Sequence, residues 1–377
     1  MVDLNFKKLP SPCFVCEEEK LEKNLILLGK IQKEADVTIL LALKGFAMYS
    51  TFELCKKYLK GCCASGLNEA LLAQKEFGGE VHTYSPAFKP DEFEKITEIS
   101  NHIIFNSFNQ LEKYKNQIKP HNSIGIRVNP ECSTVDIDLY NPCGMHSRLG
   151  IIKNQFPKKL PSIIEGFHFH ALCEQDVDAL QLVLDKFENN FSHFFHNLKW
   201  VNFGGGHHIT RKDYNTKKLI TLLQNFKQKY PHLEIYLEPG EAIGWQTGYL
   251  EATVLDIVEN GMKIAILDTS AECHMPDTLA MPYRPDIRDA EIPFKKKYTY
   301  KLAGNTCLAG DIIGDYSFDR QLMIGDKIIL EDMIHYTMVK TTTFNGINLP
   351  SIAIKQKNNE INLIRYYSYE SYKDRLS

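Results

Sequence analysis

Short apolar runs alternate with longer amphipathic stretches from residue 37 to residue 240. The runs are rich in β-branched and aromatic residues, as in strands, whereas the stretches repeat apolar residues every three or four positions, as in helices with one buried face. The predicted strands are 37–44, 61–65, 80–84, 102–107, 123–129, 165–172, 199–204 and 234–238, and helical patterns between them include 52–59, 69–75, 177–184 and 219–226. Eight such units predict a closed (β/α)8 barrel of TIM type around a parallel sheet.

The pattern changes after about residue 246, where strands follow one another without helices between them. We predict these strands at 249–258, 262–268, 298–303, 326–331, 335–344 and 351–355. The chain is therefore expected to form two domains, a barrel over 17–246 and a C-terminal all-β domain over 247–377 that includes 1–16. Residues 130–164 form too long a connection for a plain loop, and we expect a functional loop and a helix there.

Composition fits a globular protein and argues against some classes of function. The 377 residues are 44% hydrophobic and 24% charged, which is enough for two cores. A formal net charge of −3, from 44 basic and 47 acidic residues, argues against a nucleic-acid-binding surface. Residues 1–8 lack an apolar signal core and no segment approaches the length of a membrane span, so we expect a soluble, cytoplasmic protein.

Ten cysteines are scattered along the chain. Cys13 and Cys16 form a C-x-x-C pair, but no second pair completes a zinc site, so we predict two buried thiols at a strand edge. Reduced cysteines are typical of a reducing compartment.

Lys44 ends the first apolar run of the predicted barrel. A lysine desolvated at the end of a buried strand has a depressed pKa and can form a Schiff base with a carbonyl compound or with pyridoxal phosphate. The alternative is a lysine that extends its amine to solvent at the barrel rim. The residues at the ends of the later strands decide between these interpretations.

Active sites of βα barrels lie at the C-terminal ends of the strands, and phosphate is commonly bound after the seventh and eighth strands. This rule selects Ser65, Arg127 and His170, and it selects Gly204, Gly205 and Gly206 after the seventh strand. Three residues without Cβ let backbone N–H groups face an anion. The run could instead be a mobile loop, but together with Lys44 it favours a phosphorylated cofactor.

Glu238 closes the eighth strand, where an apolar run should bury it. A buried carboxylate needs a partner, and the protonated ring nitrogen of pyridoxal phosphate would be one. Alternatively, Glu238 caps a turn or pairs with Arg127.

Four histidines raise the possibility of a metal site: His168, His170, His207 and His208. They form no helical i,i+4 pair, and a phosphate loop has no place in a simple zinc site. We therefore predict no metal and expect the flat imidazole of His170 to stack on a cofactor ring.

The ordered set of these motifs resembles the fold-type III pyridoxal-phosphate decarboxylases, which include the ornithine and diaminopimelate decarboxylases. The resemblance runs from about residue 10 to residue 355. The motifs that carry it are Lys44, His170, Gly204-Gly-Gly206, Glu238-Pro-Gly240, Cys307 with Gly310-Asp311, and Tyr336 with Thr343-Phe-Asn-Gly346.

The resemblance implies a role for each of these residues. Lys44 would be the Schiff-base lysine, His170 would stack on the ring, and Glu238 would hold the ring nitrogen. The phosphate would be held by Gly204, Gly205, Gly206, Gly240 and Tyr336. Cys307 would donate a proton from the other subunit, because members of this family are head-to-tail homodimers with shared active sites.

Within this group, residues 41–46, 62–69, 170–174 and 273–277 are most similar to members that convert carboxynorspermidine or carboxyspermidine into norspermidine or spermidine in polyamine biosynthesis. Two departures make an amino-acid substrate less expected. Glu241 stands where ornithine and diaminopimelate decarboxylases usually have arginine, and Leu308 stands where the diaminopimelate enzyme has glutamate. The residues expected to contact the substrate are Glu238 and, for its distal ammonium groups, Glu272, Asp277, Asp311 and Asp315. Surface solvation is the alternative for the distal acids.

Three other functions remain open on the sequence. The chain could decarboxylate ornithine or diaminopimelate, or it could be a racemase, although racemases have a tyrosine in place of Cys307. It could also be a non-catalytic regulator of the same fold, although the intact Lys44 argues against that.

Overall fold

The computed structural model describes residues 9–281 and 283–377. The N-terminal residues 1–8, in which the sequence lacks a signal core, lie outside this range. The chain forms two compact units: a barrel unit over residues 22–243, and a sheet unit that combines the residues up to 21 with residues 244–377.

The barrel unit contains the predicted eight-stranded closed barrel, in which all neighbouring strands are parallel. Its strands are β2 (Thr38–Ala42), β3 (Gly61–Ala64), β4 (Glu80–Tyr84), β5 (His102–Phe105), β6 (Ser123–Arg127), β7 (Ile164–His168), β8 (Trp200–Asn202) and β9 (Glu234–Leu237). The barrel prediction is therefore confirmed, with each predicted strand overlapping an observed one.

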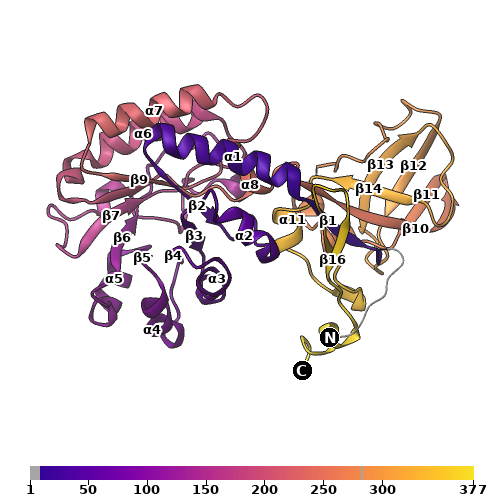
Figure 1. Cartoon of the computed structure of the whole chain (residues 1–377), viewed down its shortest axis with the longest axis horizontal. Helices are drawn as coiled ribbons and strands as arrows, with labels where there is room; N and C mark the ends of the chain where they lie inside the picture. Colours follow the sequence, from indigo (N-terminus) through magenta and orange to yellow (C-terminus); the bar gives the residue numbers. More distant parts are fainter. Residues whose placement is uncertain (1–8, 282) are drawn as a thin grey trace. The chain divides into compact units, whose positions relative to one another are not determined.

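Helices surround the barrel strands (Figure 1). They are α1 (Glu18–Ala35), α2 (Phe52–Cys55), α3 (Leu67–Leu72), α4 (Pro90–Ile99), α5 (Phe108–Tyr114), α6 (Val177–Phe191), α7 (Thr216–Lys229) and the short α8 (Glu241–Gly244). Polar residues cap several of them: the side chain of Asp176 accepts a hydrogen bond from Ala179 N at the start of α6. In the same way Asn215 caps α7, so this helix begins at Thr216.

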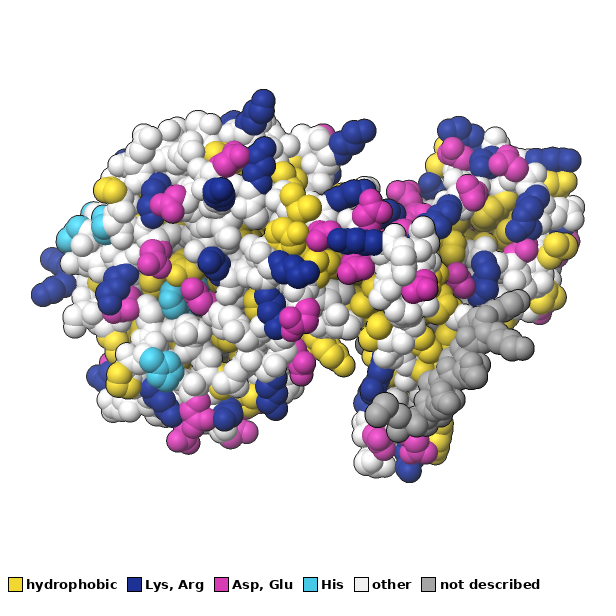
Figure 2. Space-filling view, in the orientation of Figure 1, with side chains coloured by type: hydrophobic (Ala, Val, Ile, Leu, Met, Phe, Trp, Pro, Cys, Tyr) yellow, Lys and Arg dark blue, Asp and Glu magenta, His cyan; other side chains and the backbone are white. Residues whose placement is uncertain are grey.

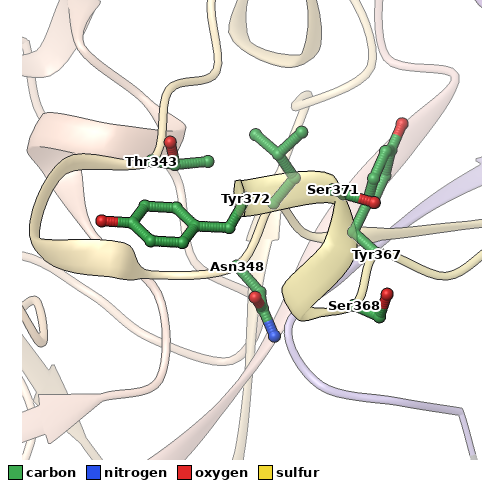
Figure 3. A pocket seen from close by; sticks show the side chains of 7 residues that line it. Thr343, Asn348, Tyr367, Ser368, Ser371 and Tyr372 are labelled. Carbon is green, nitrogen blue, oxygen red and sulfur yellow. The ribbon is translucent and has the colours of Figure 1, made fainter. Parts of the chain in front are cut away.

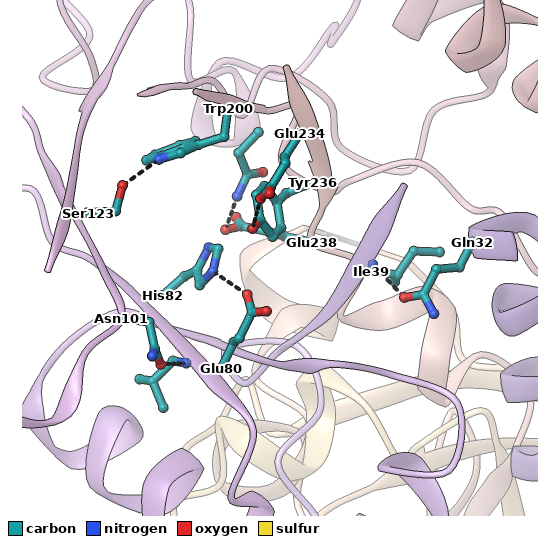
Figure 4. A network of polar contacts seen from close by, with 12 residues as sticks. Gln32, Ile39, Glu80, His82, Asn101, Ser123, Trp200, Glu234, Tyr236 and Glu238 are labelled. Carbon is teal, nitrogen blue, oxygen red and sulfur yellow. Dashed lines mark hydrogen bonds and ion pairs between the residues drawn. The ribbon is translucent and has the colours of Figure 1, made fainter. Parts of the chain in front are cut away.

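Large side chains fill the barrel towards the starting ends of its strands. The rings of His82 and His102 stack with their centroids 3.8 Å apart, and His102 also stacks on Trp200. Trp200 fits because its neighbours on β6 and β7 are Gly125 and Gly166, where a Cβ would lie 2.4 and 2.0 Å from the indole. Figure 4 shows Trp200 hydrogen-bonded to Ser123, and His82 to Glu80. This end of the barrel is thus a packed core, and the other end is left for chemistry.

The sheet unit has the strand order β13-β12-β11-β10-β1-β15-β16, and β14 pairs with β10. Its strands are β1 (Cys13–Glu17), β10 (Gly248–Asn260), β11 (Met262–Leu267), β12 (Tyr298–Ala303), β13 (Ile312–Phe318), β14 (Lys327–Glu331), β15 (Ser351–Lys355) and β16 (Ile361–Arg365). Cys13 and Cys16 are buried in β1, as predicted, but β1 lies between two strands rather than at an edge.

Two sequence predictions of elements are wrong. Residues 335–344 form the short helix α11 (Tyr336–Val339) and irregular structure instead of a strand, and the N–H of Thr342 bonds to Cys273 O. Segment 130–164 has no α-helix among its residues, all of which the structure describes, and contains only 3₁₀ turns at 138–140 and 153–155. Prolines at 130, 142, 157 and 161 interrupt any helix there.

No helix within the described residues is both long and apolar enough to cross a membrane. Charged side chains of both signs are interspersed on the face shown in Figure 2.

A small pocket in the sheet unit lies between residues 343–349 and the C-terminal segment that includes α12 (Tyr369–Lys373) (Figure 3). Its lining residues are Thr343, Asn348, Leu349, Tyr367, Ser368, Ser371 and Tyr372. These are not the residues that the sequence predicts to bind cofactor or substrate.

Candidate active site

Lys44 and His170 come together at the C-terminal end of the barrel. Lys44 follows β2 and His170 follows β7, and Lys44 Nζ lies 3.3 Å from His170 Nε2. The Lys44 side chain borders a space open to solvent, yet protein atoms surround its amine so closely that desolvation, aided by the nearby Arg127 guanidinium, lowers the pKa of Lys44. Desolvation and the neighbouring Lys44 likewise hold the pKa of His170 well below its usual value.

Glu238 is held by two side chains on neighbouring strands. His168 Nε2 lies 3.1 Å from one carboxylate oxygen, and Asn202 Nδ2 donates to the other at 2.7 Å. Burial alone would raise the pKa of Glu238, but the attraction and hydrogen bonds of these partners lower it to about 2. Glu238 is therefore a carboxylate at neutral pH, and it lies close enough to Lys44 to favour the charged form of that amine.

Arg127 has partners other than Glu238. Its guanidinium donates to the backbone carbonyl of His170 at 3.1 Å and lies 4.6 Å from the centre of the Tyr84 ring. Of the alternatives for Glu238, an ion pair with Arg127 is therefore not what the structure shows.

The glycine run is required by the packing of the barrel rim. Gly204 and Gly206 have φ values of +67° and +88°, which favour glycine. A Cβ on Gly205 would lie 2.1 Å from Glu238 O, and one on Gly206 would lie 1.9 Å from Leu172 O. Two of the three N–H groups bond within the protein: Gly204 N to Asn202 Oδ1 at 2.9 Å, and Gly205 N to His170 Nδ1 at 3.2 Å. The run is thus a fixed part of the rim that orients His170.

The four histidines have four different neighbours. His168 contacts Glu238, His170 contacts Lys44, His207 Nδ1 lies 2.8 Å from Tyr214 Oη, and His208 Nε2 lies 2.9 Å from Glu241 Oε2. Within residues 9–281 and 283–377, no three His, Cys, Asp or Glu side chains are grouped so that they could hold a metal ion.

In the sheet unit, Asp311 connects the loop of Cys307 to the loop of Glu272. Its buried carboxylate accepts five hydrogen bonds at 2.6–3.3 Å, from Ser270 Oγ, Ala271 N, Glu272 N, Thr306 N and Thr306 Oγ1. Cys307 is exposed, and its N–H donates to Asn345 Oδ1 at 2.8 Å. Asp311 therefore holds other predicted site residues in place and has little capacity left for a ligand.

Two of the remaining predicted acids have basic partners within the sheet unit. Lys340 Nζ lies 2.7 and 2.9 Å from the two carboxylate oxygens of Asp277 and 5.3 Å from the centre of the Tyr336 ring, so these three residues form one group. Asp315 pairs with Lys301 at 2.8 Å, on β13 and β12. An ammonium group thus already neutralises each of these two carboxylates.

The sequence pattern does not identify the residues that orient the predicted site residues. Asn202 and Asn345 contact Glu238 and Cys307 directly. The sequence offers a reason to select Asn202, because it is a polar residue in the apolar run Trp200–Phe203 of a barrel strand. Asn345 lies in an irregular segment, and no periodicity points to it.

Comparisons with known proteins show the family of this chain. A family model described as "Pyridoxal-dependent decarboxylase, C-terminal sheet domain" matches residues 13–334. The carboxynorspermidine/carboxyspermidine decarboxylase of Campylobacter jejuni is 49% identical over 97% of this chain and 98% of its own length. The carboxyaminopropylagmatine decarboxylase of Synechocystis is 46% identical over 98% of this chain and 96% of its own.

A solved structure of carboxynorspermidine decarboxylase from Campylobacter jejuni, complexed with norspermidine, has a TM-score of 0.92 to this chain at 48% identity. The match covers 97% of this chain and 100% of that one.

Proposed function

The chain belongs to the pyridoxal-dependent decarboxylases, and from that premise we propose that it converts carboxynorspermidine and carboxyspermidine into norspermidine and spermidine by removal of a carboxylate as carbon dioxide. The observation that carries the proposal is the 49% identity, over nearly the whole of both chains, to an enzyme named for these two substrates. The same likeness makes a non-catalytic role or an amino-acid substrate the weaker alternative.

The residues at the barrel rim fit pyridoxal phosphate. Lys44 offers an amine, His170 a flat ring, Glu238 an ionised carboxylate, and the glycine loops a backbone that approaches closely. When bound, the cofactor supplies an aldehyde that condenses with amines and a ring that accepts electrons. Because Gly204 and Gly205 use their N–H groups within the protein, we assign the phosphate to Gly206 and Gly240.

His170 keeps Lys44 ready to react as an amine. The Gly205 N–H donates to His170 Nδ1, so a neutral ring carries its proton on Nε2, which lies 3.3 Å from Lys44 Nζ. That proton can be donated to Nζ only when the amine is uncharged. The lowered pKa of Lys44 favours the same state, which is the nucleophilic one.

Glu238 would hold the ring nitrogen of the cofactor in its protonated form. A carboxylate with a pKa of about 2 stays ionised and can accept that hydrogen bond throughout the neutral range. His168 and Asn202 fix its orientation, which makes the charge available without rearrangement.

Cys307 returns a proton to Cα after the bond from Cα to the carboxylate carbon breaks. Its thiol loses the proton that forms the new C–H bond, and the thiolate is reprotonated from solvent. We propose that it acts in the active site of the other subunit of a homodimer. Glu272, Asp277 and Asp315 are proposed to bind the distal ammonium groups, which would then replace Lys340 and Lys301 as partners of the last two.

A second substrate is favoured by one observation. The Synechocystis relative, at 46% identity, is named for carboxyaminopropylagmatine, whose distal group is a guanidinium rather than an ammonium. Acidic side chains pair with either cation.

The deciding experiment measures carbon dioxide release from the purified protein with five substrates: carboxynorspermidine, carboxyspermidine, carboxyaminopropylagmatine, ornithine and diaminopimelate. We expect kcat/KM for the first two to exceed that for the two amino acids by at least about 100-fold, because an acidic pocket left without its cationic partners costs several kcal/mol. Higher turnover of carboxyaminopropylagmatine would select the second substrate, and equal turnover of diaminopimelate would overturn the polyamine assignment. Lys44→Ala protein is the negative control.

A further inference from the structure

An acidic side chain lies on the barrel rim beside the glycine loops. Glu241 follows Gly240 at the end of the loop that leaves β9, where it begins the short helix α8. This loop packs against the loop of Lys44, because a Cβ on Gly45 would lie 2.9 Å from Glu241 N. A carboxylate here would repel the phosphate of the cofactor, since like charges repel strongly where water is scarce.

The carboxylate of Glu241 is paired with an imidazole. His208 Nε2 lies 2.9 Å from Glu241 Oε2, and the two side chains are 3% and 15% exposed. The preceding histidine lies in a different environment, because burial and the neighbouring His208 lower the pKa of His207 to about 4. Of these two neighbouring histidines, His208 is the one that contacts the carboxylate of Glu241.

The pair belongs to a set of contacts between the loops that follow β8 and β9. Gly205 packs against the carbonyl of Glu238, and Thr210 Oγ1 donates to Ala242 O at 2.5 Å. His208 is itself fixed by its backbone, since its N–H donates to Gln175 O and its carbonyl accepts from Arg211 N, both at 3.0 Å. Of these contacts between the two loops, the His208–Glu241 pair is the one made by an acidic side chain.

We propose that the contact between His208 and Glu241 determines how tightly the phosphate of pyridoxal phosphate is held. The imidazole of His208 holds the carboxylate of Glu241 at 2.9 Å and so allows an acid to remain beside an anion-binding loop. This inference rests on the proposed function, because it requires a phosphorylated cofactor at this rim.

Substitution of His208 and substitution of Glu241 should have opposite effects on the rate at which the cofactor is released. His208→Gln removes the imidazole that holds the Glu241 carboxylate, so the cofactor should leave the holoenzyme about tenfold faster, because a carboxylate that is no longer held can approach and repel the phosphate. Glu241→Gln removes the repelling charge, so release should be unchanged or slower. The double variant should behave like Glu241→Gln. A pair with only a structural role predicts instead that both single variants release the cofactor faster.

The test follows the visible absorbance of bound cofactor while holoenzyme is dialysed. Glu80→Gln is the matched control, because Glu80 also pairs with a histidine, His82, but at the opposite end of the barrel. Its release rate should equal that of the unmodified protein. A second series is reconstituted with pyridoxal, which lacks the phosphate, and there the difference between His208→Gln and Glu241→Gln should disappear.

Failure of this inference is distinguishable from failure of the proposed function. Faster release in both single variants, or an equal difference with pyridoxal, would overturn the role of the pair while leaving the cofactor chemistry standing. If the unmodified protein binds no pyridoxal phosphate at all, the proposed function itself fails.

Discussion

Lys44 combines a side chain that reaches solvent-accessible space with an amine whose pKa is lowered by its surroundings. Borohydride reduction of the holoenzyme should therefore fix the cofactor on Lys44, because an uncharged amine at a barrel rim is the group that reacts with an aldehyde. Peptide mapping by mass spectrometry locates the label. Lys44→Ala should fold but take up no label, and a label on another lysine would contradict the assignment.

The proposed function gives the charge of Glu238 a direct effect on turnover. Glu238→Gln should lower kcat at least about 100-fold with little change in KM, because the variant loses a charge that is used in the transition state.

The depressed pKa of Glu238 also makes the stability of the folded protein depend on pH. The contribution of this carboxylate to stability is complete above its ordinary value of 4.5 and is lost as pH falls towards 2.

Measurement of kcat and of urea denaturation at several pH values checks both statements. Near-normal kcat in Glu238→Gln would mean that the carboxylate only holds His168 and Asn202 in place.

The sequence could place Lys44, His170 and Glu238 at one end of the barrel because the ends of parallel strands are readable from an apolar pattern. The side chains that contact these residues could not be predicted from the sequence. Whether Glu238 contacts Arg127 or His168 depends on side-chain direction across three strands, which no linear spacing records.

At the scale of elements, Asp311 connects the loops of Glu272 and Cys307, which are far apart in the sequence. Asp311→Asn should lower kcat about tenfold or more, because an amide nitrogen would face backbone or hydroxyl donors where a carboxylate oxygen now accepts their hydrogen bonds. The loop of Cys307 should loosen, and the rate of Cys307 alkylation by iodoacetamide should change. Retention of the cofactor should not change.

Asp326→Asn is the control for this change. Asp326 also accepts hydrogen bonds within the sheet unit, from Arg320 and from Met323 N, but in a surface turn. It should leave both kcat and the alkylation rate unaltered. Equal effects of the two variants would mean that Asp311 contributes only general stability.

Substitution of Gly205 tests whether the barrel rim is tightly packed. Gly205→Ala should destabilise the protein by about 1–3 kcal/mol, the usual cost of forcing an atom into a filled space, because its Cβ would lie 2.1 Å from Glu238 O. Gly66→Ala, where a Cβ would meet no atom within 4 Å, should change stability by no more than about 0.5 kcal/mol. Urea denaturation compares the two, and similar values for both would contradict the packing argument.

Element prediction succeeded where periodicity is strong and failed where tertiary contacts decide. The sequence does not reveal β13, which contains Gly314 and Asp315, or β16, because these outer strands of the sheet alternate apolar and polar residues weakly. The Thr- and Val-containing segment 335–344 has a strand-like composition, but its backbone bonds to other loops.

At the scale of the whole molecule, the proposed homodimer predicts complementation between inactive variants. Lys44→Ala and Cys307→Ala should each be nearly inactive alone. If Cys307 serves the other subunit, mixing and reassociating the two should restore about a quarter of normal activity, because half of the dimers are mixed and each mixed dimer has one intact site. Assays of carbon dioxide release before and after mixing measure this. No recovery, with reassociation shown by tagged subunits, would mean that each chain supplies both residues of its own site.

Strand β1 bonds to β10 on one side and to β15 on the other, although the entire barrel unit separates it from both in the sequence. On the ribosome, residues 13–17 therefore emerge early and remain without either neighbour until residues 248–251 and then 351–355 have been made. Four of the five residues of β1 are buried in the finished sheet, so the nascent chain carries an apolar strand with two unpaired edges during most of its synthesis. Slow translation prolongs that interval, and the first strand to be made is among the last to be paired.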